Sequence, residues 1–284
     1  MPIQNVSDTA RWVAVYRAME TARRNPLFRD PFAARLAGTQ GPQVVKELKR
    51  GKSLAMPMIV RTAVFDELIM DRVNNGGVDT VINLAAGLDT RAWRLPLPPS
   101  LRWFDVDLPG MTEFKADAMR EEKPVCVYEA IAADLTSDAE RSELLTRLGA
   151  GCSTALVISE GLLIYLTAER VAALARDLHA MQCARWWLID LANPRLLQIM
   201  IRSWGKQVAA GSAPFQFAPA EGTAFFNQFG WHEAVFRSGI YEGKRLHREM
   251  PLGPLWRAML RIAPAAKREE GRRMSGFVLL ERND

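Results

Sequence analysis

The sequence predicts an α/β fold: a doubly wound, mostly parallel seven-stranded sheet with a helical cap. Short apolar runs alternate with helical patterns from about residue 79 to residue 190, which is the order of βαβ units. The runs are almost continuously apolar, as expected of strands that are covered on both faces. The first run enters a turn of small residues and the second ends on an acid, which is typical of a Rossmann-like ligand-binding edge.

Two helical segments precede the first predicted strand. Apolar residues recur with helical spacing between Thr9 and Leu36, although Asn25-Pro26 and Asp30-Pro31 interrupt the pattern. A second segment runs from about Met58 to Val73 and ends at an Asn-Asn-Gly-Gly turn. Because both segments come before the sheet begins, residues 1–75 are expected to form a helical cap that closes over a site.

Seven apolar runs are the predicted strands. They cover residues 80–84, 101–106, 125–131, 155–159, 186–189, 231–236 and 276–281. Residues 79–190 form the predicted cofactor-binding core, and residues 223–284 are expected to complete the sheet with an antiparallel pair. A helix with one apolar face is expected over Thr167–Met181. Residues 193–222 contain Gly, Ala and Pro in their second half and are expected to be a lid insertion.

Length and composition describe a single globular domain over residues 1–284. This length approaches the upper limit of one core, and contents of 49% hydrophobic and 24% charged residues are ordinary. No uninterrupted apolar stretch reaches the roughly 18 residues of a spanning helix, and the first residues do not resemble a signal peptide. The sequence therefore predicts a cytoplasmic protein with no membrane partner.

The net charge of +5 and the pI near 9.3 raise the question of nucleic-acid binding. The densest basic groups are Lys244-Arg245, Lys267-Arg268 and Arg272-Arg273, and glutamates interrupt them. No basic stripe with interleaved aromatic residues is present, so a solvated basic face is the preferred interpretation and no nucleic-acid partner is expected. The excess positive charge would also suit a small anionic substrate.

The three cysteines, Cys126, Cys152 and Cys183, show no C-x-x-C spacing. Neither a disulfide framework nor a metal site is therefore expected. Cys126 and Cys183 lie in or near apolar runs and are expected to be buried as small hydrophobic residues.

The turn after the first predicted strand carries the clearest ligand signal. Small residues in Asn83–Arg91 let the backbone approach a ligand, and Asp107, about twenty residues later, offers a carboxylate to ribose hydroxyls. A dinucleotide fold needs G-x-G-x-x-G against a pyrophosphate, but Gly87 is the only glycine here and Asp89 would repel a phosphate. A dehydrogenase is therefore not expected. A ligand with a ribose and a cationic centre but no phosphate fits better, which indicates S-adenosyl-L-methionine.

Four segments resemble, in order and spacing, motifs of the leucine carboxyl methyltransferase family. Asn83–Arg91 is similar to its N-L-G-x-G-x-D-T-R motif, and Arg61-Thr62 with Phe65-Asp66 is similar to its R-T-x-x-x-D helix. Phe104–Pro109 resembles its E-V-D-x-P strand, and Ser159–Leu166 resembles its A-E-G-x-x-x-Y-L segment. The family includes bacterial O-methyltransferases associated with polyketide and secondary metabolism. The resemblance therefore implies a class I methyltransferase fold.

Two positions depart from these family motifs. Ala85 stands where the family usually has glycine, and its methyl group is expected to narrow the approach of the backbone to the cofactor unless its φ is ordinary. Asp105 replaces the usual glutamate and shares a strand face with Asp107. Asp107 lies nearer the strand end and matches the ribose-binding acid of the family, so it is the preferred candidate.

The resemblance also implies how the remaining cofactor-binding residues act. Arg61 is expected to pair with the methionyl carboxylate, Gly87 to admit the methionyl chain, and Glu160 to lie beside the amino group or the sulfonium. Asp134 is expected to accept a hydrogen bond from the adenine amine, and Leu135 to pack on the ring. A purely structural role is the alternative for each of them. For Asp134 that role is the cap of the helix that follows.

Arg17 and Tyr165 are the candidate catalytic residues, and the resemblance implies that both grip a carboxylate of the methyl acceptor. The alternatives are a solvated arginine and a core tyrosine. None of the three histidines, His179, His232 and His247, is expected near the strand ends, so no general base is evident. A carboxylate is already ionised at neutral pH, whereas a phenol or alcohol benefits from a base. This favours a carboxylate acceptor.

The predicted function is that of an S-adenosyl-L-methionine-dependent O-methyltransferase that forms a methyl ester on a small-molecule metabolite. Methylation of a phenol or hydroxyl is the alternative, and a non-catalytic cofactor-binding protein is another. An enzyme that methylates nitrogen is not expected, because no Asn/Asp-Pro-Pro-aromatic turn follows the fourth strand. Aromatic residues in and after the lid favour an apolar or aromatic acceptor; they are Trp204, Phe215, Phe217, Phe225 and Phe226.

Overall fold

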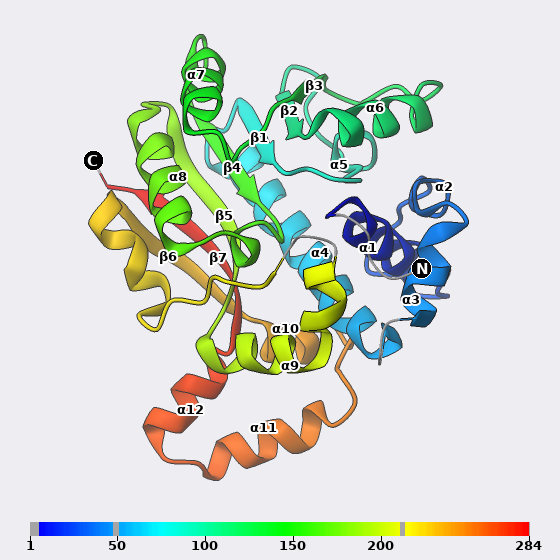
Figure 1. The fold of residues 1–284 in the computed structure, drawn as a ribbon, viewed down its shortest axis with the longest axis vertical. Helices are drawn as coiled ribbons and strands as arrows, with labels where there is room; N and C mark the ends of the chain where they lie inside the picture. Colours follow the sequence, from blue (N-terminus) through cyan, green and yellow to red (C-terminus); the bar gives the residue numbers. More distant parts are fainter. Residues whose placement is uncertain (1–5, 48–50, 211–213, 284) are drawn as a thin grey trace.

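The computed structural model of the chain describes residues 6–47, 51–210 and 214–283. Its strands form one sheet in the order β3-β2-β1-β4-β5-β7-β6, with helices on both faces (Figure 1). The strands are β1 (Thr80–Leu84), β2 (Arg102–Asp107), β3 (Val127–Ala132), β4 (Ala155–Ser159), β5 (Ala184–Ala192), β6 (Trp231–Ser238) and β7 (Ser275–Arg282). β1 to β5 are parallel, and β7 runs antiparallel to β5 and β6. The predicted doubly wound, mostly parallel sheet is thus confirmed.

Helices form the N-terminal part of the described chain and fill the connections between strands. The α-helices are α1 (Val6–Thr21), α2 (Ala33–Ala37), α3 (Gln40–Glu47), α4 (Gly51–Asn75), α5 (Arg91–Arg94), α6 (Pro109–Ala118), α7 (Asp138–Gly149), α8 (Ala168–Ala180), α9 (Pro194–Ala210), α10 (Gly239–Arg245), α11 (Gly253–Ile262) and α12 (Ala265–Arg272). Two 3₁₀ helices are η1 (Leu163–Tyr165) and η2 (Gly222–Phe229). Helices α1, α2 and α3 gather at one side of the sheet, where α4 joins them (Figure 1).

The sheet separates two apolar cores. Alternate residues of a strand point to opposite faces, so Ile82 and Leu84 of β1 pack into one core with α7 and α8, whereas Val81 packs into the other with α4. β1 and β4 are buried along their whole length, which explains why their sequences show no alternation of apolar and polar residues. Burial on both faces fixes the strand register and therefore where the strands end.

The third strand and one cysteine are more exposed than their apolar surroundings predict. β3 lies at the end of the sheet, and its Val127 is 58% exposed. Cys126 is buried as expected, but the expectation for Cys183 is wrong, because that residue is half-buried in the loop ahead of β5. An apolar run shows that a strand forms but not whether a second strand covers its outer edge.

Two helices differ from the predicted segments. α4 begins at Gly51, ahead of the predicted start near Met58, and includes Pro57. α9 is helical where the lid was expected to be a loop. Its Leu197 and Met200 pack against the apolar cluster around Trp12. This apolar contact favours a helix, whereas the Gly- and Ala-containing composition predicted a loop.

The first helix is joined to a segment close to the other end of the chain. Glu20 of α1 is fully buried, and its Oε1 lies 2.6 Å from Nη2 of Arg248. Glu20 also accepts from the amide of Leu27 at 2.8 Å, and Arg248 donates to the carbonyl of Asn25 at 2.7 Å. Since a buried carboxylate needs such partners, Arg248 fixes the position of α1.

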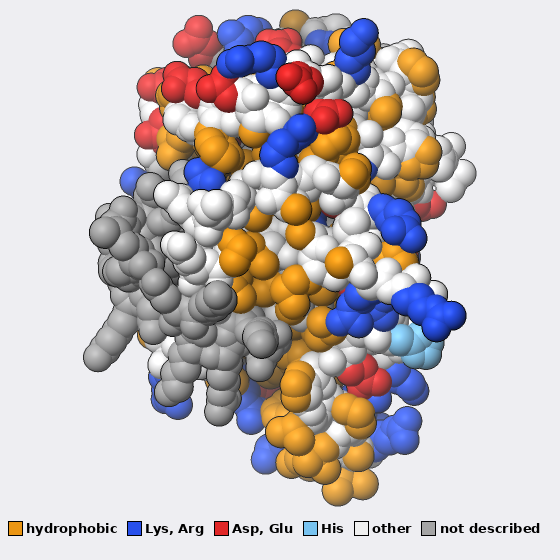
Figure 2. Space-filling view, turned by 90° about the vertical axis from the view of Figure 1, so that its right-hand side faces the viewer, with side chains coloured by type: hydrophobic (Ala, Val, Ile, Leu, Met, Phe, Trp, Pro, Cys, Tyr) orange, Lys and Arg blue, Asp and Glu red, His pale blue; other side chains and the backbone are white. Residues whose placement is uncertain are grey.

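Helices α11 and α12 project from the body of the molecule (Figure 1), and apolar side chains gather at this end (Figure 2). Leu255, Met259 and Ile262 of α11 are exposed. Within the described ranges, none of the helices combines the length and the apolar content that a membrane crossing requires.

Leu188→Ala in β5 is expected to lower the free energy of unfolding by about 2 to 5 kcal/mol, because it opens a cavity between covered faces of the sheet. Leu188 is fully buried between β4 and β7. Leu255→Ala is the control and should change the free energy by less than about 0.5 kcal/mol. Urea unfolding followed by circular dichroism measures both; equal effects would contradict this description of the core.

Candidate functional site

The turn after β1 places a backbone amide on the acid at the end of β2. Ala85 and Gly87 in this turn both have a φ of 52°. The amide of Gly87 donates to Oδ2 of Asp107 at 2.6 Å, and the amide of Leu108 donates to Oδ1 at 2.7 Å. Burial raises the pKa of the Asp107 carboxyl, and the two amides offset part of this rise. The predicted residues Gly87 and Asp107 are thus in direct contact.

Ala85 adopts the backbone conformation of the glycine that it replaces. A φ of 52° lies in the left-handed region, which glycine enters freely. For an alanine this conformation costs roughly 1 to 2 kcal/mol, because Cβ approaches the following carbonyl oxygen. The φ of Ala85 is therefore not an ordinary one for alanine. The turn has the shape that glycine would give it, and Ala85 adds backbone strain and a methyl group.

The two acids of β2 have different surroundings. Asp105 is buried and accepts side-chain hydrogen bonds from Asn83 at 3.0 Å, Trp103 at 2.8 Å, Lys115 at 2.5 Å and Tyr128 at 3.0 Å. Its carboxylate oxygens are therefore used within the protein. Asp107 lies two residues further along the strand, and the hydrogen bonds described for its carboxylate come only from backbone amides. This difference supports the choice of Asp107 made from the sequence.

Arg61 of α4 lies between two carboxylates at the ends of β4 and β5. Its Nε donates to Oε1 of Glu160 at 2.9 Å, and its Nη1 donates to Oδ2 of Asp190 at 3.0 Å. The amide of Gly161 donates to the other Asp190 oxygen at 2.6 Å. Burial opposes the charge of Arg61, but Asp190 and Glu160 outweigh it and raise the pKa of the guanidinium. Gly161 has a φ of 70°, and an added Cβ there would lie 3.0 Å from Nη1 of Arg61, so both the backbone and the close approach favour glycine.

The ion pairs continue from Glu160 into the segment after β1. Oε2 of Glu160 lies 2.7 Å from Nη1 of Arg91, and Nε of Arg91 donates to Asp66 at 2.7 Å. Asp66 also accepts from Arg94 at 2.6 and 2.8 Å. We call this set the arginine–carboxylate chain; its members are Asp190, Arg61, Glu160, Arg91, Asp66 and Arg94. Residues of three of the sequence motifs meet in it, which explains why the motifs occur together.

Helix α1 packs directly on the turn after β1. A Cβ added at Gly87 would lie 3.2 Å from Cβ of Ala10. Arg17 is buried; its Nε pairs with Asp30 at 2.8 Å, and its Nη2 donates to the carbonyl of Leu88. A buried guanidinium requires such a carboxylate. The expected grip of Arg17 on an acceptor would therefore compete with an ion pair that the protein already contains.

Asp134 and Leu135 lie in the loop between β3 and α7. Oδ1 of Asp134 accepts from the amide of Thr136 at 2.8 Å. Ser137 is the N-cap of α7 and accepts from the amide of Glu140. Asp134 thus stabilises the turn before α7. This role is similar to the helix cap considered as its structural alternative, but the cap itself is Ser137. Leu135 is half-buried against the core that contains α7.

Tyr165 in η1 lies near Arg61 and stacks on Phe215. Their ring centroids are 5.5 Å apart, with an interplanar angle of 28°. Burial raises the pKa of the Tyr165 hydroxyl to about 12, and Thr9 forms a hydrogen bond with it. The hydroxyl is therefore protonated at neutral pH and can donate a hydrogen bond.

The aromatic residues expected to line an acceptor pocket fall into two groups. Phe215 contacts Tyr165, whereas Phe217, Phe225 and Phe226 pack into the sheet core with α8 and β5. The side chain of Trp204 lies outside the described residues. Of the expected aromatic residues whose side chains the structure describes, Phe215 is the one that stacks on Tyr165 in the strand-end region.

Asp190 and Asp30 are site residues that the sequence pattern did not indicate. Asp190 directly follows the predicted strand 186–189 as Glu160 follows β4, so the strand-end rule would have indicated it had it been applied to that strand. Asp30 offers no such signal, because its contact with Arg17 depends on how two helices and a turn pack together.

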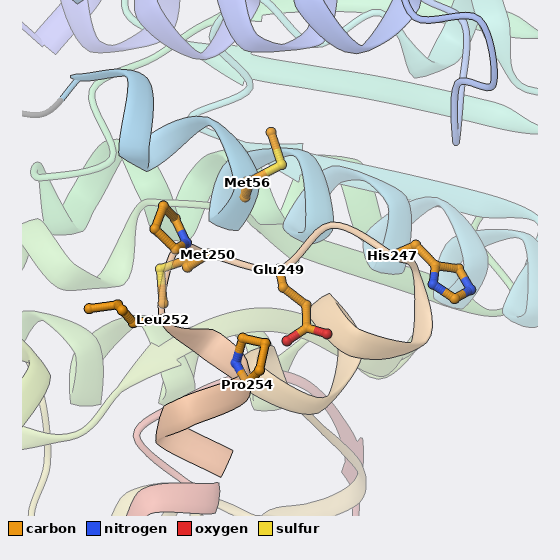
Figure 3. Close-up of a pocket in the computed structure, with 7 residues that line it drawn as sticks. Met56, His247, Glu249, Met250, Leu252 and Pro254 are labelled. Carbon is orange, nitrogen blue, oxygen red and sulfur yellow. The ribbon is translucent and has the colours of Figure 1, made fainter. Parts of the chain in front are cut away.

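A separate surface hollow of about 580 Å³ lies between α4 and the segment before α11 (Figure 3). Met56, His247 and Met250 are among its lining residues, and none of the predicted site residues lines it. The carboxylate at this hollow, Glu249, is paired with Arg257. Among the described side chains, no cluster of His, Cys, Asp and Glu could hold a metal ion.

A sheet of this order with carboxylates near the carboxyl ends of β2, β4 and β5 defines a Rossmann-like protein that binds a nucleoside-type cofactor. The sequence profile of the leucine carboxyl methyltransferase family matches residues 10–179. The chain belongs to this family.

Named relatives agree with this assignment. A Frankia alni protein named as an S-adenosyl-L-methionine-dependent methyltransferase is 34% identical over 241 residues, which are 80% of this chain and 83% of that protein. A Streptomyces coelicolor protein of the same description is 37% identical over 176 residues, 58% of this chain and 62% of that protein. A crystal structure of a DUF574 family protein from Streptomyces avermitilis has a TM-score of 0.60 at 12% identity and covers 97% of both chains, which shows the shared fold. The protein is thus an S-adenosyl-L-methionine-dependent methyltransferase.

Ala85→Gly is expected to raise the free energy of unfolding by about 1 kcal/mol, because glycine adopts this left-handed conformation without the Cβ clash. Ala86→Gly is the matched control: Ala86 is not among the described residues with positive φ, so glycine there should lower the free energy by about 0.5 to 1 kcal/mol. Chemical unfolding of the two variants and the wild type measures the difference. A loss of stability in both variants would contradict strain at Ala85.

Proposed function

We propose that the enzyme transfers a methyl group to an oxygen of a small-molecule metabolite, and that this oxygen belongs to a carboxylate. One observation carries the proposal: the described strand-end side chains are paired ions, the Asp107 carboxylate held by two backbone amides, and a protonated tyrosine, with no group among them poised to remove a proton. An ionised carboxylate needs no base to act as a nucleophile, whereas a phenol or alcohol benefits from one.

The charges at the strand ends fit the amino-acid part of S-adenosyl-L-methionine. In the proposal, Arg61 pairs with the methionyl carboxylate, and Glu160 with Asp190 receives the amino group. Arg61 uses Nε and Nη1 for the two carboxylates and, among the described hydrogen bonds, Nη2 for neither, so a zwitterion finds a partner for each of its charges here. Gly161 supports this arrangement because it leaves room for the guanidinium.

The turn after β1 and the loop after β3 suit the nucleoside part. Gly87 lets the backbone approach the cofactor, and Asp107 accepts the ribose hydroxyls in the proposal. Asp134 receives the adenine amine on the oxygen that Thr136 does not use, and Leu135 packs on the ring. When bound, the cofactor supplies a sulfonium whose methyl group is already activated for displacement. The protein residues align the acceptor and exclude water.

The three histidines, all within the described residues, make their contacts away from the predicted site residues. His179 packs edge-on against Trp231, His232 pairs with Asn283, and His247 borders the surface hollow. Tyr165, with its pKa raised by burial to about 12, is a hydrogen-bond donor at neutral pH. In the proposal its hydroxyl orients the acceptor carboxylate.

Arg17 receives a positioning role in the proposal, in place of the acceptor contact that the sequence suggested. Its guanidinium joins Asp30 to the carbonyl of Leu88 and so holds α1 against the turn that carries Gly87. A residue that is buried and paired contributes by keeping the cap in place.

Asp107→Ala is expected to weaken binding of S-adenosyl-L-methionine by about tenfold to a hundredfold, because the ribose hydroxyls lose a charged acceptor. Isothermal titration calorimetry measures the dissociation constant. Asp138→Ala removes an exposed carboxylate of α7 and should bind as the wild type does. Wild-type affinity in Asp107→Ala would remove this residue from the proposed site.

Methyl transfer to an aromatic carboxylic acid is expected to vary little between about pH 6 and pH 9, because the acceptor stays ionised well above its pKa near 4. With a phenol of the same ring framework, the rate should rise about tenfold per pH unit below a pKa near 10. Transfer of a labelled methyl group measures both, and alkaline release of methanol identifies an ester. Transfer to phenols alone would overturn the carboxylate proposal.

A further inference from the structure

Two of the three cysteines meet at the edge of the sheet opposite to the strand ends of the candidate site. Cys152 precedes β4, and Cys183 precedes β5. These strands are neighbours with Ala155 opposite Ala184, and the amide of Ala155 donates to the carbonyl of Cys183 at 2.7 Å. Parallel pairing therefore brings together two cysteines whose sequence spacing did not relate them.

The two cysteines share a hydrogen-bond acceptor and are partly accessible. The amide of Cys152 and Sγ of Cys183 lie 3.3 and 3.9 Å from the carbonyl oxygen of Gly149. The interaction between the two side chains raises the pKa of Cys152 and lowers the pKa of Cys183, so Cys183 ionises more readily. Both side chains are half-buried, whereas Cys126 is buried. An accessible thiol of lowered pKa beside a second thiol is the arrangement that disulfide exchange requires.

Neighbouring groups hold the two thiols in place. Sγ of Cys152 lies 3.7 Å from Oδ1 of Asp79, whose other oxygen accepts from the amide of Ser153 at 3.0 Å. Sγ of Cys183 lies 3.9 Å from the carbonyl of Gly149. A bond between the sulfurs would therefore link two segments that the fold already keeps adjacent.

We propose that Cys152 and Cys183 are a redox-active pair that reacts with a low-molecular-weight disulfide such as oxidised glutathione. The Cys183 thiolate attacks one sulfur of the small disulfide, whose S–S bond breaks and releases one thiol. The Cys152 sulfur loses its proton to solvent and attacks the Cys183 sulfur of the mixed disulfide, which releases the second small thiol. Two protein thiols are oxidised to one disulfide, and the small disulfide is reduced to two thiols.

The bond would close the segment 152–183, which contains β4, Glu160 and Tyr165. A cross-link acts mainly by restricting the unfolded chain, so the melting temperature is expected to rise by roughly 5 °C or more. The sulfurs lie at the edge of the sheet away from the candidate site, so oxidation is expected to stabilise the protein without blocking cofactor binding.

The test is incubation of the full-length protein with oxidised glutathione, alkylation of the remaining thiols under denaturing conditions, and peptide mapping by mass spectrometry. The expected product links Cys152 to Cys183 and leaves Cys126 alkylated. Cys152→Ser should stop at one glutathionyl group on Cys183, and the matched control Cys126→Ser should form the same cross-link as the wild type. Thermal melts of oxidised and reduced protein measure the shift.

Alkylated Cys152 and Cys183 in the oxidised wild-type protein would overturn the proposal. So would a cross-link that involves Cys126, or a mixed disulfide on Cys183 that persists in the wild type. The wild-type peptide map decides between these outcomes without any variant, so a serine variant that folds poorly does not affect the result.

Discussion

A guanidinium buried away from water requires a carboxylate, and this requirement organises the site end of the molecule. Glu160 is shared by Arg61 and Arg91 and so joins α4, the end of β4 and the segment after β1. Removing Asp66 would leave the buried guanidinium of Arg94 without its carboxylate, at a cost of about 3 to 5 kcal/mol. These segments therefore cannot move independently. The arginine–carboxylate chain holds the side chains that are proposed to bind the cofactor in a fixed geometry before any ligand binds.

The regular part of the fold could be predicted wherever burial is imposed by the chain itself. The bounds of β1 and β4 follow from the sequence because both strands are mainly apolar and both are buried along their whole length. β3 and α9 were predicted less accurately. The exposure of β3 and the helicity of α9 both depend on which neighbouring segments they contact. Only the packed molecule contains that information.

The same distinction applies to the candidate site. Arg61, Asp107 and Glu160 could be named because acids at the ends of parallel strands, and the motifs around them, occupy defined places along the chain. The partner of Arg17 could not, since Asp30 reaches it through the packing of α1 against a turn. The left-handed conformation of Ala85 could not be predicted from the sequence either. An alanine in place of the family's glycine does not show whether the backbone keeps the conformation of the glycine.

The ion pair between Glu20 and Arg248 connects the order of synthesis to the placement of the cap. Helix α1 is synthesised before the sheet, and its buried glutamate pairs with Arg23 just after the helix and with Arg248 more than two hundred positions later. Since non-local contacts form only after the distant residues have emerged from the ribosome, Glu20 has only its local partner until the segment around Arg248 has been made. A nascent chain that stops before Arg248 thus lacks the contact that ties α1 to the segment after α10, and its cap is not yet held as it is in the folded protein.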